Sequence, residues 1–311
     1  MGNLRIGCVG EAMVELSPSA IPGTTQIGVA GDVLNTAIYL RRSLPVNHSV
    51  SFVSLLGADQ ISEDMAKFIA SQGLETDRLG QLPGFLPGAY AITTDSSGER
   101  SFHYWRENSA ARQMFQRGDE DRFAVLDGLD VIYLSGITLA ILPAATRCTL
   151  LERIKAFTQT GGKFVFDSNY RPNLWECAEV ARKTVQSAWK ICDIALPSVD
   201  DEMSLFEETT EAEVLDRFSS YQNCFGALKR GALGPFSINK NCAEVTFDRA
   251  SDVVDTTAAG DGFNGGYLAA ILRGSTQENA LTKGHELACR IVMHKGAILP
   301  VNADRPNADG V

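Results

Sequence analysis

Short apolar segments alternate with amphipathic helix patterns along most of this chain, and this alternation restricts the possible folds more than any other feature. The apolar segments predict strands at Leu4–Val9, Val50–Leu55, Val131–Leu134, Lys163–Asp167, Ile194–Leu196 and Ala227–Lys229. The patterns between them predict helices at Val33–Arg42, Ser62–Gln72, Ala144–Thr158 and Glu179–Trp189. Strands that alternate with helices form βαβ units, so we expect an α/β fold with a mainly parallel sheet and helices on both faces.

Two segments depart from this alternation, and neither is followed by a crossover helix. Met13–Val29 is strand-like and carries turn residues. Gly88–Trp105 is typical of a hairpin, with a turn at Asp95–Gly98. We expect the two segments, about residues 12–30 and 86–107, to form a small β-sheet that acts as a lid. The whole chain, residues 1–311, is predicted to be a single domain.

Composition excludes several classes of protein. The formal net charge of −10 argues against nucleic acid or an anionic membrane as the main partner. The seven cysteines are scattered without a CxxC pair, so we expect neither a zinc site nor a disulfide framework. No apolar stretch approaches the ~20 residues of a membrane span, and the first residues have no signal-peptide core. We therefore expect a cytoplasmic protein whose partners are small molecules.

The segment Val253–Leu272 carries the strongest chemical signal. It predicts a strand, then the small-residue turn Asp255–Asp261, then a helix. Free backbone N–H groups at a helix N-terminus attract phosphate, and a carboxylate placed there, that of Asp261, can take a proton from an attacking hydroxyl. The other interpretation, an acidic cap on a tightly packed helix, remains open. The first interpretation indicates phosphoryl transfer to an alcohol.

Two further segments are candidates for substrate contacts. Gly31 lets a ligand approach the backbone closely, and Asp32 and Asn35 follow it in a first helical turn that can bind sugar hydroxyls. An N-cap and a packed helix start remain the alternative. Arg171 follows a predicted strand, at the end of the sheet where α/β proteins bind ligands, and its planar fork suits carboxylate or phosphate. A surface salt bridge is the alternative there.

The predicted lid hairpin carries aromatic residues and an arginine. Tyr104 and Arg106 are two residues apart, so on a strand they point to the same side, and with Tyr90 they suit an acidic sugar. Cross-strand packing is the alternative interpretation. Lys229–Gly234 ends a strand with two glycines and can cradle nucleotide phosphates, although it lacks the residue order of a P-loop.

Together these motifs resemble the ribokinase-like (PfkB) family of sugar kinases. Asp255–Asp261 matches that family's pattern D-T-x-[GA]-A-G-D, and the resemblance extends from about residue 6 to residue 300 with the motifs in family order. Within the family the chain is most similar to the kinases of 2-keto-3-deoxygluconate. The segments that carry this likeness are Gly10–Leu16, Gly31–Ala37, Gly98–Arg106, Leu134–Ile137 and Asn169–Pro172.

The resemblance implies a three-layer α/β core with a β-sheet lid, ATP with Mg²⁺, and transfer of the γ-phosphate to the 6-hydroxyl of the sugar acid. It implies that Asp261 is the catalytic base and that the N–H groups of Ala258, Ala259 and Gly260 form an anion hole. The substrate contacts that it implies are Gly31, Asp32, Asn35, Tyr90, Tyr104, Arg106 and Arg171. The nucleotide contacts are Asn169, Lys229, Gly231, Gly234 and Gly260.

Some positions depart from the family pattern. Ala30 stands where a second glycine is usual, and Ser198–Asp201 replaces the magnesium-associated N-x-x-E motif, which leaves the metal ligands unassigned. Family members often respond to a monovalent cation, and no residue here is assigned to one. A homo-oligomer formed through the lid is expected. The alternative functions are a kinase of fructose, ribose or the galactonate epimer, and a sugar-acid sensor without catalysis.

Overall fold

The computed structural model describes residues 2–19, 21, 23–94, 100–116, 122–221, 223–243 and 245–301. Within these residues the main sheet has the strand order β12-β11-β10-β9-β8-β1-β4-β5. All neighbours are parallel except β11 and β12, which confirms the mainly parallel sheet. The strands are β1 (Arg5–Val9), β4 (Ser49–Leu56), β5 (Leu79–Gln81), β8 (Val131–Ser135), β9 (Lys163–Asp167), β10 (Ile194–Ala195), β11 (Phe225–Leu228) and β12 (Phe236–Ile238).

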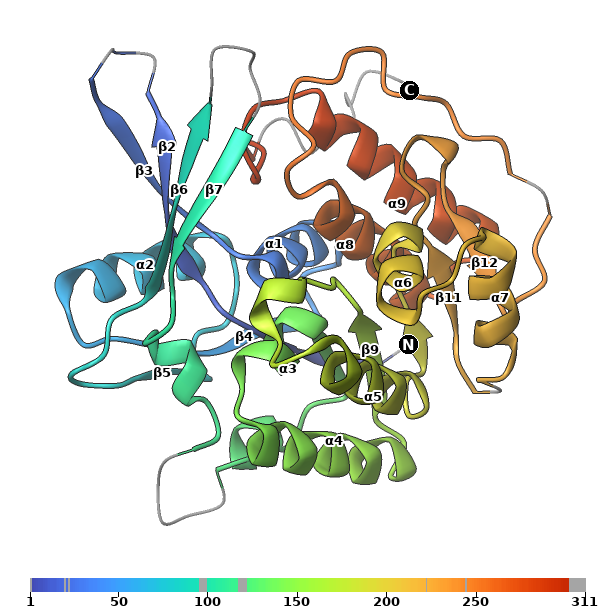
Figure 1. The fold of residues 1–311 in the computed structure, drawn as a ribbon, viewed down its shortest axis with the longest axis horizontal. Helices are drawn as coiled ribbons and strands as arrows, with labels where there is room; N and C mark the ends of the chain where they lie inside the picture. Colours follow the sequence, from blue (N-terminus) through green and yellow to red (C-terminus); the bar gives the residue numbers. More distant parts are fainter. Residues whose placement is uncertain are drawn as a thin grey trace.

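Helices cover both faces of this sheet (Figure 1). One face packs against α1 (Asp32–Ser43), α2 (Gln60–Ser71), α8 (Ala259–Leu272) and α9 (Gln277–Val292). The other packs against α3 (Gly136–Ile141), α4 (Ala144–Gln159), α5 (Ala178–Trp189), α6 (Val199–Phe206) and α7 (Glu211–Ser219). Short 3₁₀ turns lie at η1 (Ala110–Gln113), η2 (Ala124–Leu126), η3 (Pro172–Leu174) and η4 (Gly231–Leu233).

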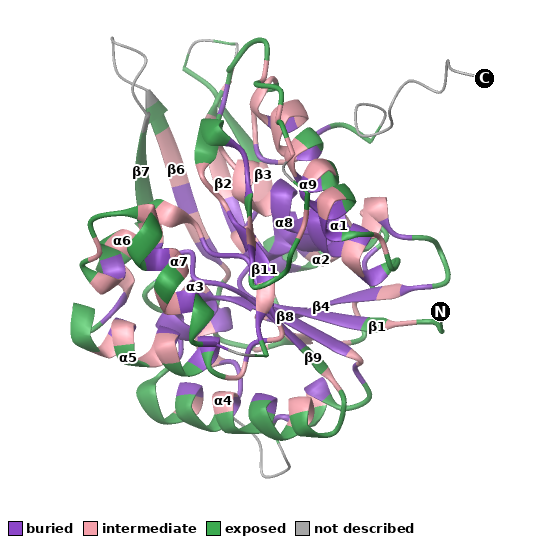
Figure 2. Ribbon diagram, turned by 90° about the vertical axis from the view of Figure 1, so that its right-hand side faces the viewer, coloured by how far each residue is buried: buried purple, intermediate pink, exposed green. Residues whose placement is uncertain are grey.

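The three layers follow from the alternation of side chains along each strand. In β8, Ile132 and Leu134 join the core beneath α3–α7, whereas Val131 and Tyr133 join the core beneath α1, α2, α8 and α9. Successive strand residues point to opposite faces, so a strand that is apolar throughout supplies both cores. Figure 2 shows the strands of the main sheet buried along most of their length, while the outer faces of α4 and α5 are exposed.

A second sheet stands apart from the core, as predicted (Figure 1). It contains β2 (Met13–Pro18), β3 (Thr25–Ala30), β6 (Gly88–Thr94) and β7 (Arg100–Trp105) in the order β3-β2-β6-β7, and we call it the lid sheet. Tyr90 and Tyr104 are directly opposite each other in the antiparallel pair β6–β7. The predicted turn Asp95–Gly98 lies outside the described residues, whereas the two strands that it connects, β6 and β7, are described.

One expected strand is absent: the residues just before Asp255 do not join a sheet. Val253 and Val254 are 59% and 52% exposed, and the amides of Val254 and Asp255 donate to the carbonyl of Val292 at the end of α9. Their hydrogen bonds are therefore made to a helix end and not to a neighbouring strand. None of the helices in the described residues has both the length and the apolarity that crossing a bilayer requires.

Candidate active site

The candidate site begins at the N-terminus of α8, over the carboxyl ends of the parallel strands. Ala258 caps this helix with a φ of 61°, a left-handed conformation that residues other than glycine rarely adopt. Ala259, Gly260 and Asp261 then form its first turn. The N–H groups of a first helical turn have no partner within the helix, so this turn presents donors to an anion.

Glycines let α8 lie close to its neighbours. A Cβ atom on Gly265 would lie 2.7 Å from Cβ of Tyr39 on α1, and one on Gly266 would lie 2.9 Å from the carbonyl of Lys283 on α9. The close approach of α1 and α8 brings their first turns together. The side-chain amide of Asn35 donates to Oδ2 of Asp261 over 2.9 Å, and the hydroxyl of Thr36 donates to the Asp261 carbonyl over 3.3 Å.

The environment of Asp261 suits a general base. Burial raises the pKa of Asp261 to about 8, and the negative charge of Asp32 adds to this shift. The hydrogen bond from Asn35 and the positive charge of Lys229 act in the opposite direction. A carboxyl group with a pKa near neutrality accepts a proton far more readily than an ordinary Asp, which is the property that proton transfer from a hydroxyl requires.

Asp32 links α1 to the ends of two strands. Its Oδ2 atom accepts a hydrogen bond from Nδ2 of Asn169 over 2.9 Å and another from the hydroxyl of Ser135, the last residue of β8. Asn169, which follows β9, has a φ of 31°. Gly31 precedes Asp32, and a Cβ atom there would lie 2.2 Å from the carbonyl of Glu11, so the chain needs glycine at this crossing.

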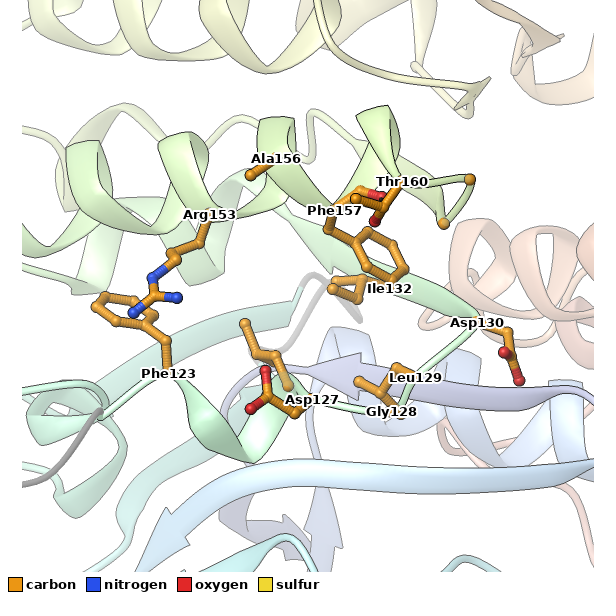
Figure 3. A pocket seen from close by; sticks show the side chains of 13 residues that line it. Phe123, Asp127, Gly128, Leu129, Asp130, Ile132, Arg153, Ala156, Phe157 and Thr160 are labelled. Atoms are coloured by element: carbon orange, nitrogen blue, oxygen red, sulfur yellow. Dashed lines mark hydrogen bonds between the residues drawn. The ribbon is translucent and has the colours of Figure 1, made fainter.

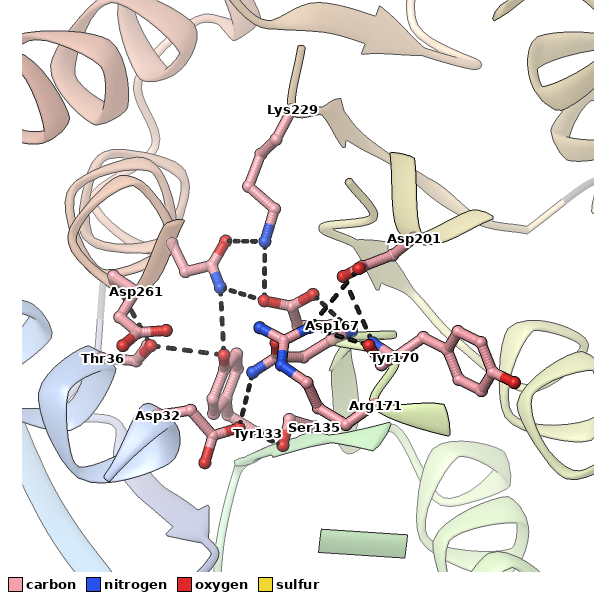
Figure 4. A network of polar contacts seen from close by, with 12 residues as sticks. Asp32, Thr36, Tyr133, Ser135, Asp167, Tyr170, Arg171, Asp201, Lys229 and Asp261 are labelled. Carbon is pink, nitrogen blue, oxygen red and sulfur yellow. Dashed lines mark hydrogen bonds and ion pairs between the residues drawn. The ribbon is translucent and has the colours of Figure 1, made fainter. Parts of the chain in front are cut away.

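A buried polar cluster lies beside Asp261 (Figure 4). The Lys229 amine is 2.6 Å from Oδ2 of Asp167 and 3.1 Å from Oδ1 of Asn264. Asn264 donates to the same Asp167 oxygen over 2.6 Å and to the Tyr133 hydroxyl over 3.1 Å. Tyr133 in turn lies 3.3 Å from the hydroxyl of Thr36. The cluster joins β8, β9, the end of β11 and helix α8.

Arg171 lies at the edge of the same site. Its Nη1 atom is 3.4 Å from Oδ1 of Asp201, and the other oxygen of that carboxylate accepts from the amide of Tyr170 over 3.2 Å. Burial raises the pKa of Asp201, while Arg171 opposes the shift. The Arg171 side chain is 53% exposed, so its guanidinium remains accessible to a ligand.

The lid sheet contributes aromatic rings, and its connections to the core contribute a buried ion pair. The rings of Tyr90 and Tyr104 have centroids 5.7 Å apart, and the Tyr90 hydroxyl donates to Glu15. Arg106 follows β7 and is 7% exposed, and its guanidinium pairs with the buried carboxylate of Glu11. A Cβ atom on Gly88, two residues before Tyr90, would lie 3.2 Å from Cβ of Arg106, which places Arg106 on the Tyr90 side of the lid.

The glycines of the predicted nucleotide segment take conformations that favour glycine. Gly231 has a φ of 54° and Gly234 a φ of 77°, and η4 lies between them. The segment follows β11 directly, so it lies at the carboxyl end of the main sheet with Lys229. No group of three or more His, Cys, Asp or Glu side chains in the described residues is arranged to hold a metal ion.

The structure thus brings α1, α8 and the ends of β8, β9 and β11 together around Asp261. Sequence reasoning did not assign Thr36, Tyr133, Ser135, Asp167, Asn264, the lid-sheet carboxylate of Glu15, or Glu11, which precedes the lid sheet. A signal existed for Asp167, a charged residue that ends an apolar strand, and for Asn264, an amide between apolar and glycine residues of its helix. Tyr133 and Thr36 carried no such signal, because both types are common in cores.

A cavity of about 500 Å³ lies at the opposite end of the sheet (Figure 3). Its walls come from Leu126–Asp130, which precede β8, and from the end of α4, which precedes β9. Ligands of open α/β sheets bind at the carboxyl ends of the strands, and this cavity is at the amino ends. We therefore take the surroundings of Asp261, and not this cavity, as the candidate site.

Comparisons with known proteins show the family to which the chain belongs. The chain matches the pfkB family carbohydrate kinases over residues 3–304. It is 38% identical to a 2-dehydro-3-deoxygluconokinase of Dickeya dadantii, over 97% of this chain and 99% of that one. It is 36% identical to a 2-dehydro-3-deoxygluconokinase of Escherichia coli K12, over 96% and 98%.

The fold is also that of solved kinases. The structure of a fructokinase from Vibrio cholerae O395, described with fructose, ADP and a calcium ion bound, superimposes with a TM-score of 0.81 at 21% identity and covers 96% of each chain. A structural similarity at 21% sequence identity shows only a shared fold. The family is shown by the sequence matches, which extend over nearly the full length of the chain. The chain belongs to the pfkB family of carbohydrate kinases.

Proposed function

We propose that this protein is an ATP-dependent kinase that phosphorylates the 6-hydroxyl of 2-dehydro-3-deoxygluconate (2-keto-3-deoxygluconate). The product is 2-keto-3-deoxy-6-phosphogluconate. The observation that carries the substrate is identity of 36–38% to 2-dehydro-3-deoxygluconokinases over nearly the whole chain. The catalytic unit that we propose is a single domain, residues 1–311, with the lid sheet closing over the substrate.

In the reaction, the carboxylate of Asp261 takes the proton of the 6-hydroxyl as the oxygen attacks the γ-phosphorus. The bond between that phosphorus and the β–γ bridging oxygen breaks, and ADP leaves with the electron pair. The raised pKa of Asp261 supports this role, since it lets the group hold the proton near neutral pH. The N–H groups of Ala258, Ala259 and Gly260 are proposed to bind the transferring phosphoryl group, where each donor is worth ~3 kcal/mol.

The substrate contacts that we propose surround Asp261. Asp32 and Asn35 are in the first turn of α1, so they can hold sugar hydroxyls beside the base, with the Gly31 backbone adjacent. Arg171 and Arg106 supply the positive charge for the carboxylate end, and Tyr90 and Tyr104 of the lid close over it. An anionic substrate helps to offset the desolvation cost of burying Arg106, because a guanidinium can bind a carboxylate with two hydrogen bonds.

ATP is proposed to bind between α8 and the segment after β11, with Asn169, Lys229, Gly231, Gly234 and Gly260 near its phosphates. The solved relatives include a fructokinase with bound ATP from Xylella fastidiosa and the fructokinase with ADP and calcium, which supports ATP and a divalent cation. We propose Mg²⁺ as that cation. The lack of a metal-binding cluster in the described residues fits Mg²⁺, which is usually held by phosphates and water with few protein ligands.

We also propose that the enzyme acts in the cytoplasm and self-associates through the lid sheet. All seven cysteines are free, as expected in a reducing compartment. Ile27 on β3 is 73% exposed and Trp105 on β7 is 56% exposed, which favours burial against a second lid. Size-exclusion chromatography with light scattering tests this proposal: Ile27→Glu should lower the mass of an oligomer, and a monomeric wild-type protein would contradict it.

The function itself is tested by measuring ADP release with ATP, Mg²⁺ and a panel of acceptors. The panel contains 2-keto-3-deoxygluconate, its galactonate epimer, fructose, ribose and gluconate. We expect strong turnover on the keto-deoxy acids alone. Strong turnover on fructose or ribose would identify a neutral-sugar kinase, and no turnover on any acceptor would favour a sensor.

A further inference from the structure

A Lys229–Asp167 ion pair lies close to the turn that carries Asp261, and the proposed reaction gives Asp167 and its neighbour Asn264 no role. The Lys229 amine is 2.6 Å from Oδ2 of Asp167 and 3.1 Å from Oδ1 of Asn264. Asp167 is 2% exposed, Asn264 is fully buried, and the Lys229 side chain is 10% exposed. Burying an ammonium and a carboxylate is costly, so a buried ion pair adds little net stability and its presence is better explained by another role.

The pair is attached to the first turns of α8 from below. Asn264 is three residues after Asp261, so the two side chains lie on neighbouring parts of one helix face. The Asn264 amide donates to Asp167 over 2.6 Å and accepts from Lys229, which ties the helix to the ion pair. A Cβ atom on Gly260 would lie 3.8 Å from the Lys229 amine, so the cation is adjacent to the residue that precedes Asp261.

We propose that Lys229 and Asp167 are positioning residues that set the charge state of the base, Asp261. Lys229 supplies the positive charge that favours the carboxylate form of Asp261. Asp167 and Asn264 hold the Lys229 amine in place, and the negative charge of Asp167 partly offsets the effect of Lys229 on Asp261. This inference rests on the proposed function, and in particular on Asp261 as the base.

The charged groups around Asp261 support this assignment. Asp32 on α1 and Asp167 on β9 raise its pKa, whereas the hydrogen bond from Asn35 and the charge of Lys229 lower it. The phenols of Tyr90 on β6 and Tyr133 on β8 also face this region, and both have raised pKa values, so they are neutral. Lys229 thus opposes the effect of the carboxylates of Asp32 and Asp167 on the base, and Arg171 is a further cation at the edge of the site.

The test is the pH profile of kcat/KM, whose acid limb reports the pKa of the free enzyme's base. Removing the cation in Lys229→Met should move this limb to higher pH by about half a unit or more, and removing the anion in Asp167→Asn should move it to lower pH. The double variant should lie between the two. Lys229→Arg keeps the charge and should keep the limb near its wild-type position.

A matched control exists at the other end of the same strand. The Lys163 amine is 2.9 Å from Oδ1 of Asp193, at the amino end of β9 and far from the carboxyl-end site. Lys163→Met should leave the pH profile unchanged. Circular dichroism and thermal melts establish that each variant folds, and if Asp167→Asn does not, the contrast between Lys229→Met and Lys229→Arg decides the question.

Opposite shifts in the two single variants support the inference, because a purely structural role gives no reason for opposite signs. Limbs that coincide with wild type, or that move in the same direction, overturn it. If Lys229→Met raises the KM for ATP while the acid limb of its pH profile stays at the wild-type position, the inference is also overturned, and the only role left for Lys229 is nucleotide binding. A wild-type protein that releases no ADP on any acceptor overturns the proposed function, and this inference with it.

Discussion

The side-chain amide of Asn35 donates a hydrogen bond to Oδ2 of Asp261 over 2.9 Å, across 226 residues of chain. The contact joins the first turn of α1 to the first turn of α8 and stabilises the charged form of the carboxylate. Asn35→Ala should therefore raise the pKa of Asp261, move the acid limb of kcat/KM to higher pH, and lower turnover at pH 7 about tenfold or more. Steady-state rates from pH 6 to 9 measure this, and a limb at the wild-type position would contradict it.

Replacing the proposed base should separate binding from turnover. Asp261→Asn keeps the size of the side chain but cannot accept the proton, so turnover should fall by about 10²- to 10⁴-fold. Binding of the sugar acid, measured by isothermal titration calorimetry, should change little. Activity near the wild-type level in this variant would remove Asp261 from the proposed mechanism.

The same substitution should affect stability in a pH-dependent way. The pKa of Asp261 in the folded protein, about 8, lies above the ordinary value of 3.8. The stability that this raised pKa contributes to the free energy of unfolding is therefore fully present below pH 4 and is lost as the pH rises through 8. At pH 9, Asp261→Asn should be more stable than wild type by ~2 kcal/mol, a value reduced because the side chain is not wholly buried. At pH 4 the two proteins should be nearly equal in stability. Denaturant unfolding at both pH values tests the sign.

The buried pair of Glu11 and Arg106 joins the two connections between the core and the lid sheet. Removing one charge leaves the other buried and unpaired, so Glu11→Gln should lower the free energy of unfolding by about 3 kcal/mol. It should also raise the KM for the sugar acid, because Arg106 loses the partner that orients it. Urea unfolding and steady-state kinetics measure both effects. Arg5→Gln, which breaks an exposed ion pair with Asp130, is the control and should change each of them little.

Ala258 adopts a φ of 61° where glycine is tolerated without strain. Ala258→Gly should therefore keep full activity and raise stability by ~0.5 kcal/mol, since relief of strain exceeds the added freedom of the unfolded chain. Ala258→Val should lose both stability and activity, because β-branched residues resist this conformation. Melting temperatures and kcat of the two variants test the prediction, and a destabilised Ala258→Gly would contradict it.

Much of the fold could be predicted from periodicity. The strands β1, β4, β8 and β9 and the helices α1, α4 and α5 lie within a few residues of their predicted bounds, because continuous apolar runs and amphipathic patterns are local properties. The expected strand before Asp255 is absent because its hydrogen-bond partner is the end of α9, which no local pattern reveals. The antiparallel strand β12 is only three residues long, too short to give a pattern of its own.

The sequence by itself determined the residue types and the order of the motifs. These identify the family, because D-T-x-[GA]-A-G-D and the other family motifs are each contiguous stretches of sequence. It also placed Asp261 at a helix start, because turn and helix signals are local. Only the tertiary structure decided that Asp167, Asn264 and Lys229 meet beneath that helix, and that Arg106 pairs with Glu11. These contacts join segments 35 to 97 residues apart, and they depend on the packing of helices against a shared sheet, which local patterns do not encode.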